Sequence, residues 1–123
     1  VIDDEVEVRG MLVEMIASLG HTVIQAAEGQ EGLDLLTAGK LIDLVLTDLG
    51  MPGMNGWEVV RAVKARWPHL PVGLITGWGE EPEATPEQRK EADFVIAKPV
   101  TREALRDAIV RARPKPAKFT PPA

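Results

Sequence analysis

Short apolar runs alternate along the chain with stretches in which apolar residues recur every third or fourth position. Short runs are typical of buried strands, and the wider spacing is typical of helices that bury one face. The runs predict five strands, at 1–2, 21–26, 41–47, 70–76 and 93–97, with a helix after each. Strands that are apolar on both faces, alternating with helices, indicate a doubly wound parallel α/β sheet.

Four of the five predicted helices have recognisable ends. Gly20 and Gly39 stand where a glycine commonly ends a helix, after the first and the second helix. Asn55 is a typical N-cap for the third helix, which Pro68 ends, and Thr101 is a typical N-cap for the fifth. These residues place the helix boundaries independently of the apolar spacing.

The fourth helix is the weakest of the five. Thr85, Pro86 and Gln88 fit a capping box with proline at the first helical position, but few apolar residues follow them. We therefore expect residues 77–91 to be the least stable local unit of the chain.

Four of the five strands end in polar residues, and doubly wound sheets bind ligands just outside the carboxyl ends of their strands. These residues are Asp3, Asp4, Asp48, Thr76 and Lys98. Each one alone could cap a helix or organise a turn. Together, three carboxylates at one edge would repel one another, so we expect a cation among them. Oxygen ligands without histidine or cysteine suit Mg²⁺.

This combination of side chains is suited to holding a phosphoryl group. Asp48 could attack phosphorus, Lys98 and Mg²⁺ could neutralise the phosphoryl oxygens, and Thr76 could donate a hydrogen bond to one of them. The product would be an aspartyl phosphate. His21 and His69 fall at the amino ends of strands, so we expect them at the opposite edge, as surface residues.

Composition narrows the class of protein. The 123 residues, 45% hydrophobic and 27% charged, suffice for one folded domain, which we expect at 1–112 with a Pro-rich tail or linker at 113–123. The absence of cysteine excludes disulfides and thiolate metal sites. A net charge of -5 disfavours direct nucleic-acid binding. No apolar run reaches the roughly 18 residues of a membrane span, so we expect a cytoplasmic protein without membrane insertion.

The strand ends lie in motifs that resemble the receiver domain of two-component response regulators. "VIDDE", "DLVLTDLGMPGMNGWEV", "PVGLITG" and "FVIAKPV" follow the order and spacing of that family across residues 1 to about 112. The resemblance implies a flavodoxin-like fold, with five parallel strands in the order 2-1-3-4-5 and five helices. It also implies roles for individual residues: Asp48 as phosphoacceptor, Asp3, Asp4, Asp48 and the Gly50 carbonyl as Mg²⁺ ligands, Thr76 as switch hydroxyl, and Lys98, before a cis proline, as phosphate-binding lysine.

The resemblance further implies a place in a phosphorelay. The domain would accept a phosphoryl group from a histidine kinase or a histidine phosphotransfer domain, rather than act as a turnover enzyme, and would change its surface over 77–100. The family also allows a homodimer through the fourth and fifth helices. The wording of two motifs is similar to receivers in hybrid sensor histidine kinases.

Three departures from the family pattern affect these expectations. Only two apolar residues precede the acidic pair, so either the first strand is short or the given sequence begins within it. Val95 occupies the place of an aromatic switch residue, with Phe94 beside it. Gly50 offers no side chain to orient water and Trp78 is bulky enough to shield the site, so we expect a long-lived phosphoryl form.

Three other functions remain as alternatives. An aspartyl-phosphate hydrolase would need a second carboxylate two residues after the nucleophile, where this chain has Gly50. A flavin or nucleotide binder would need a phosphate loop after the first strand, where the acidic residues would repel phosphate. A degenerate receiver that only binds partners would not need the strand-end residues, which are intact here.

Overall fold

A parallel sheet forms the centre of this computed structural model, in which residues 1–77 and 91–112 are described. Its strands are β1 (Val45–Asp48), β2 (Val72–Thr76) and β3 (Phe94–Ala97), in the order β1-β2-β3. Every residue of β1 and β2 is buried, as expected for strands covered on both faces.

The first two predicted strands are reduced to single bridges. Ile2 forms parallel bridges to Ala26 on one side and to Thr47 on the other. These bridges place residue 2 between the second predicted strand and β1, which agrees with the order 2-1-3-4-5. The third strand is also shorter than predicted: it begins at Val45, and Leu41 is 96% exposed.

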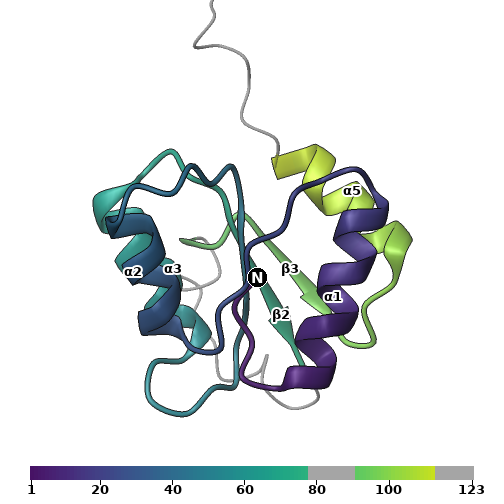
Figure 1. The fold of residues 1–123 in the computed structure, drawn as a ribbon, viewed down its shortest axis with the longest axis horizontal. Helices are drawn as coiled ribbons and strands as arrows, with labels where there is room; N and C mark the ends of the chain where they lie inside the picture. Colours follow the sequence, from purple (N-terminus) through teal and green to yellow (C-terminus); the bar gives the residue numbers. More distant parts are fainter. Residues whose placement is uncertain (78–90, 113–123) are drawn as a thin grey trace, which may run out of the picture.

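Helices cover both faces of the sheet (Figure 1). The helices α2 (Gly29–Thr37) and α3 (Gly56–Arg66) lie on one side, and α1 (Val6–Ser18) and α5 (Arg102–Ala112) on the other. The start predicted for a fourth helix and the predicted tail at 113–123 lie outside the described residues. Within the described ranges, no helix is long and apolar enough to cross a membrane.

The predicted helix ends are confirmed. The Asn55 side chain accepts a hydrogen bond from Glu58 N, and Asn55 N donates to the Glu58 carboxylate, which completes a capping box for α3. Ala104 N donates to Thr101 Oγ1 at the start of α5. Gly20 and Gly39 have φ values of 97° and 92°, which glycine adopts without strain.

Each face of the sheet has its own apolar core. Val59, Val60 and Val63 of α3 pack toward the sheet on one side, and Leu12 and Leu105 pack from α1 and α5 on the other; all five are at most 1% exposed. This burial fixes both helix pairs against the sheet and so holds its carboxyl edge in place.

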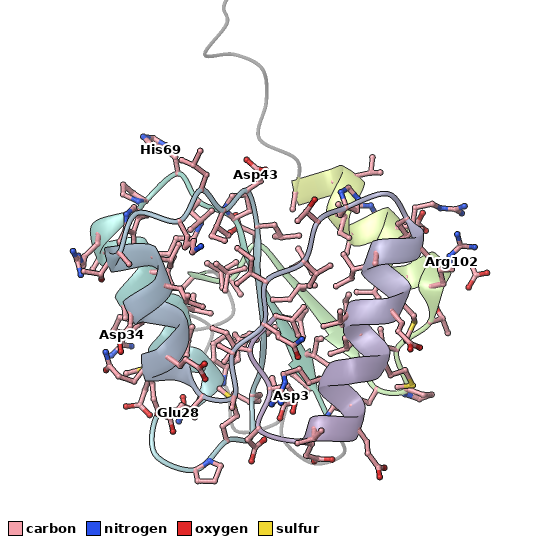
Figure 2. All side chains as sticks on the ribbon, in the orientation of Figure 1. Asp3, Glu28, Asp34, Asp43, His69 and Arg102 are labelled. Atoms are coloured by element: carbon pink, nitrogen blue, oxygen red, sulfur yellow. The ribbon has the colours of Figure 1, made fainter. Side chains whose placement is uncertain are left out.

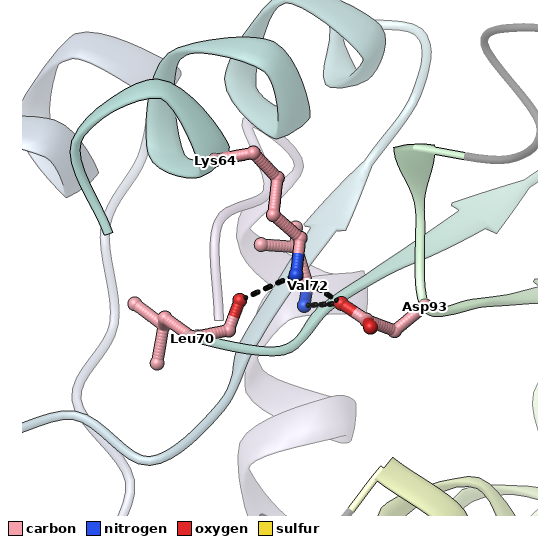
Figure 3. Close-up of polar contacts among 4 residues, drawn as sticks. All are labelled: Lys64, Leu70, Val72 and Asp93. Atoms are coloured by element: carbon pink, nitrogen blue, oxygen red, sulfur yellow. Dashed lines mark hydrogen bonds and ion pairs between the residues drawn. The ribbon is translucent and has the colours of Figure 1, made fainter. Parts of the chain in front are cut away.

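A polar cluster joins three elements at the amino ends of the strands (Figure 3). Lys64 Nζ lies 2.7 Å from Asp93 Oδ2 and donates a hydrogen bond to the Leu70 carbonyl at 2.9 Å. Val72 N donates to the same Asp93 oxygen at 2.7 Å, and Asp93 N donates back to the Val72 carbonyl at 2.8 Å. The cluster therefore ties α3 to the start of β2 and to the residue before β3.

Candidate functional site

Three carboxylates converge at the carboxyl edge of the sheet. One oxygen each from Asp3, Asp4 and Asp48 lies within 4.8 Å of the others. Asp3 is fully buried and Asp48 is 3% exposed, whereas Asp4 is exposed. Figure 2 shows Asp3 at the opposite end of the sheet from His69, as the sequence predicted.

Main-chain hydrogen bonds bring these residues together. Asp48 N donates to the Ile2 carbonyl at 2.9 Å, and Ile2 N donates to the Leu46 carbonyl at 2.7 Å. Asp3 N donates to the Ala26 carbonyl at 3.1 Å. The two bridges of Ile2 therefore align the acidic pair with the end of β1.

Lys98 and Thr76 complete the site from the neighbouring strands. Lys98 Nζ lies 3.0 Å from Asp48 Oδ1, and Lys98 N donates to the Thr76 carbonyl at 2.8 Å. Thr76, at the end of β2, is 2% exposed. The Lys98–Pro99 peptide bond is cis, as predicted. All five strand-end residues thus lie at one edge of the sheet.

Burial and charge shift the ionisation of two of these groups. Burial raises the pKa of Asp3, and the nearby negative charge of Asp48 adds to this, although a hydrogen bond from Glu5 N opposes it. For Lys98, burial acts to lower the pKa, but the hydrogen bond and charge of Asp48, with Asp3 and Glu5, outweigh it and raise the pKa. Lys98 therefore remains a cation beside Asp48.

The donor set fits a hard divalent cation. Asp3 Oδ1 accepts a hydrogen bond from Glu5 N, but Asp3 Oδ2 is buried with no hydrogen-bond partner among the described residues. A buried carboxylate oxygen without a donor is costly, and a cation would satisfy it. Carboxylate oxygens without sulfur or imidazole are the ligands that Mg²⁺ prefers. Gly50, two residues after Asp48, is itself exposed.

Two further residues shape the site without having been singled out from the sequence. A Cβ at Gly56 would lie 2.6 Å from the Asp48 carbonyl oxygen and 2.8 Å from Leu49 Cα, so α3 can begin against the end of β1 only with glycine there. The glycine directly after the Asn55 cap was the available signal. Arg9 donates from Nη1 to the Asp3 carbonyl at 2.8 Å, and no spacing in the sequence marked it.

Sequence comparison identifies the family to which this site belongs. Residues 1–110 match the response regulator receiver domain family. The chain is a member of that family. The resemblance noted in the sequence is thereby confirmed, and the chain contains a receiver domain, the signalling module of two-component systems.

Relatives of the receiver differ in length. The chain is 32% identical over 114 residues to sporulation initiation phosphotransferase F of Bacillus subtilis, covering 93% of this chain and 91% of that protein. It is 31% identical over 110 residues to the response regulator protein FleR of Pseudomonas aeruginosa, covering 89% of this chain but 23% of FleR. The chain therefore spans less than a quarter of some curated relatives.

Solved structures confirm the receiver fold. A response regulator receiver domain from Clostridium thermocellum superposes with a TM-score of 0.84 and 33% identity, covering 90% of this chain and 89% of that one. The chemotaxis protein CheY4 of Vibrio cholerae superposes with a TM-score of 0.75 and 27% identity, covering 90% of this chain and 93% of that one.

The departures from the receiver pattern have different outcomes. Val95 is 37% exposed, while the Phe94 ring lies against Gly73 on the neighbouring strand, at a point where a Cβ would overlap it. Phe94 is thus packed within the fold. Trp78 lies outside the described residues, so the long-lived phosphoryl form stays a prediction.

Proposed function

We propose that this receiver accepts a phosphoryl group on Asp48 from a phosphohistidine of a histidine kinase or histidine phosphotransfer domain. The observation that carries the proposal is the convergence of three carboxylates beside a lysine that is ion-paired to Asp48. Asp3, Asp4, Asp48 and the Gly50 carbonyl would hold Mg²⁺. The bound ion would supply positive charge to the phosphoryl oxygens and to the acidic residues.

The residues of the chain have separate tasks in the transfer. An Asp48 carboxylate oxygen forms the new P–O bond while the P–N bond to the imidazole breaks and leaves its electron pair on nitrogen. Lys98 exchanges its contact with the Asp48 carboxylate for one with a phosphoryl oxygen. Thr76 donates its hydroxyl hydrogen to another phosphoryl oxygen. The chain accepts the group and does not turn over a substrate.

Intact mass measurement tests the phosphoacceptor directly. Incubation with acetyl phosphate and Mg²⁺ should add about 80 Da, the mass of one phosphoryl group, to the wild-type chain. The same treatment should add nothing to Asp48→Asn, since its amide is a poor nucleophile, and chelation of Mg²⁺ should suppress the wild-type adduct. Asp43→Asn is the matched control, because Asp43 is an exposed aspartate at the other end of the sheet and should leave the adduct intact (Figure 2). An adduct of the same yield on Asp48→Asn would contradict the assignment.

We further propose that phosphorylation changes the surface over 77–100. The physical basis is that Thr76, directly before this segment, and Lys98, within it, would both bind the phosphoryl oxygens. Hydrogen exchange with and without acetyl phosphate should change the protection of amides across 77–100 while leaving α2 unchanged. Equal protection in both states across 77–100 would exclude this switch.

The remaining features of the proposal concern the context of the domain. The receiver domain would extend over 1–112, with 113–123 as a tail or linker, in a cytoplasmic protein. Its output could involve a homodimer through the fourth and fifth helices. The domain would be either a stand-alone receiver or one domain of a longer protein, for which the likeness of two motifs to receivers of hybrid sensor histidine kinases suggests one candidate. A hydrolase function is disfavoured by Gly50, which supplies no carboxylate.

A further inference from the structure

Arg9 connects three segments next to the acidic residues. It lies in the first turns of α1, and its Nη1 donates to the main-chain carbonyl of Asp3 at 2.8 Å. Its Nε donates to the Gln25 side-chain oxygen at 3.0 Å. The Arg9 guanidinium therefore links α1 to Asp3 and to Gln25, which lies in the segment that ends at Ala26.

The contact of Arg9 with Asp3 is to the main chain and not to the carboxylate. The Asp3 carbonyl belongs to the peptide bond that joins Asp3 to Asp4, so a donor fixed on this oxygen sets the orientation of that peptide plane. The amide on the other side of Asp3 is held by the Ala26 carbonyl at 3.1 Å. Arg9 thus supplies the second restraint on the backbone that carries both acidic side chains.

Restraint of this backbone matters because the carboxylates resist convergence. Asp3 and Asp48 are both buried, and one carboxylate oxygen of each lies within 4.8 Å of the other, so the two groups repel each other when no cation lies between them. The planar guanidinium has several donors in fixed directions, so it can hold two acceptors on different segments at once. A lysine in the same place has a single flexible ammonium and cannot reproduce this fixed fork.

We propose that Arg9 is a positioning residue that preorganises the carboxylates of Asp3 and Asp4 for a divalent cation. This inference rests on the proposed Mg²⁺-dependent phosphoacceptor function and deepens it. Arg9 would act through the main chain of Asp3, to which it donates, and not by direct contact with the cation or the phosphoryl group. Its loss should therefore weaken Mg²⁺ binding without slowing phosphorylation once the site is saturated.

Calorimetric titration of Mg²⁺ into the metal-free chain measures this directly. Arg9→Gln should raise the dissociation constant roughly tenfold or more, the usual effect of removing a group that orients metal ligands. Arg9→Lys should restore part of the affinity, because an ammonium can still reach one acceptor. Gln25→Ala should weaken binding less than Arg9→Gln, since Arg9 then keeps its bond to Asp3. The phosphorylation rate with acetyl phosphate should require more Mg²⁺ for half-saturation in Arg9→Gln, with an unchanged rate at saturation.

Arg102→Gln provides the matched control. Arg102 ties the far end of α1 to α5 by donating from Nε to Ser18 Oγ at 3.0 Å, so its loss also removes an arginine contact of α1 but leaves the site untouched (Figure 2). Arg102→Gln should lower the melting temperature without changing the Mg²⁺ dissociation constant. Wild-type affinity in Arg9→Gln, or an equal loss of affinity in Arg102→Gln, would overturn the positioning role alone. Absence of Mg²⁺ binding by the wild-type chain would overturn the proposed function and this inference together.

Discussion

Burial of Asp3 places its carboxylate in the candidate metal site but lowers the stability of the fold. Its raised pKa means that the folded chain holds the Asp3 proton more tightly than the unfolded chain does. The contribution of Asp3 to the free energy of unfolding is therefore fully present below the ordinary pKa of an aspartate and is lost as the pH rises from there through the raised pKa of the folded chain. At neutral pH without metal, burial of the Asp3 carboxyl group therefore destabilises the fold.

Replacing Asp3 by asparagine should relieve this cost. Asp3→Asn should raise the free energy of unfolding of the metal-free chain at pH 7 by about 1–2 kcal/mol, the range typical of a buried polar group without a partner. The variant should also lose the increase in melting temperature that Mg²⁺ gives the wild type. Urea and thermal denaturation with and without Mg²⁺ measure both effects.

The exposed neighbour of Asp3 provides the control for this prediction. Asp4→Asn should lose the Mg²⁺ effect in the same way, but it should change the metal-free stability little, because Asp4 is exposed. If Asp3→Asn were less stable than wild type without metal, the ionised Asp3 would not be a cost to the fold.

At the scale of single residues, the sequence predicted the polar groups of the site better than the residues that position them. Asp48, Thr76 and Lys98 each ended an apolar run, so the general rule on parallel sheets was enough to bring them together. Arg9 and Gly56 act through a main-chain hydrogen bond and through the lack of a side chain. Such roles depend on the distance between segments far apart in sequence, which no local pattern contains.

Among the helices, α3 depends on close contact with the end of β1. A Cβ at Gly56 would overlap the main chain of Asp48 and Leu49, which cannot move without disturbing the site. Gly56→Ala should therefore lower the free energy of unfolding by about 1–3 kcal/mol, as overpacking does. It should also reduce the yield of the phosphorylated form in the intact mass assay.

Gly10→Ala is a matched control for Gly56→Ala in urea denaturation. Gly10 also lies in a helix, α1, but a Cβ there has no neighbour within 4 Å. Alanine at Gly10 should raise stability by about 0.5–1 kcal/mol through helix propensity alone. Equal stability of Gly56→Ala and the wild type would contradict the close contact.

Helices were predicted more accurately than strands, for a physical reason. Helix ends have their own chemical signals, such as the Asn55 capping box and Gly20, which act within a few residues. A strand exists only where a neighbour pairs with it. The apolar run at 41–47 therefore indicated a strand without showing that its ladder begins at Val45.

On the scale of the whole molecule, a cavity of about 830 Å³ lies beside Val1 and Ile2. Apolar side chains such as Ile16, Val23 and Leu44 line it, and the Val1 amino group is buried there and donates to the Ile24 carbonyl at 2.9 Å. Burial lowers the pKa of this amino group from 8.0 to about 6. The cavity and the buried amino group both reduce the stability of the chain.

Adding the residues Val-Leu-Val before Val1 should raise the free energy of unfolding in two ways. The added side chains would fill the cavity, and the free energy of unfolding should rise by about 2 kcal/mol or more, allowing for the entropy of ordering them. The added peptide bond also replaces the buried amino group. Urea denaturation of the two chains at pH 6 and pH 8 measures the change.

The sign of the pH effect follows from the lowered pKa of the Val1 amino group. Between pH 6 and pH 8 the unfolded chain binds more protons at Val1 than the folded chain does, so stability falls as the pH falls from 8 to 6, by about 2 kcal/mol. An added Gly-Ser-Gly should remove this pH dependence without filling the cavity with apolar groups. If it stabilised as much as Val-Leu-Val, filling of the cavity would not be the cause.

The contact of Lys64 with Asp93 holds the amino ends of β2 and β3 together. One carboxylate there receives both an ammonium and the amide of Val72, so α3 and the beginnings of two strands are fastened to each other. The other end holds negative charges that repel one another. Phosphorylation of Asp48 would therefore move the carboxyl ends of the strands relative to one another, while their amino ends stay in place.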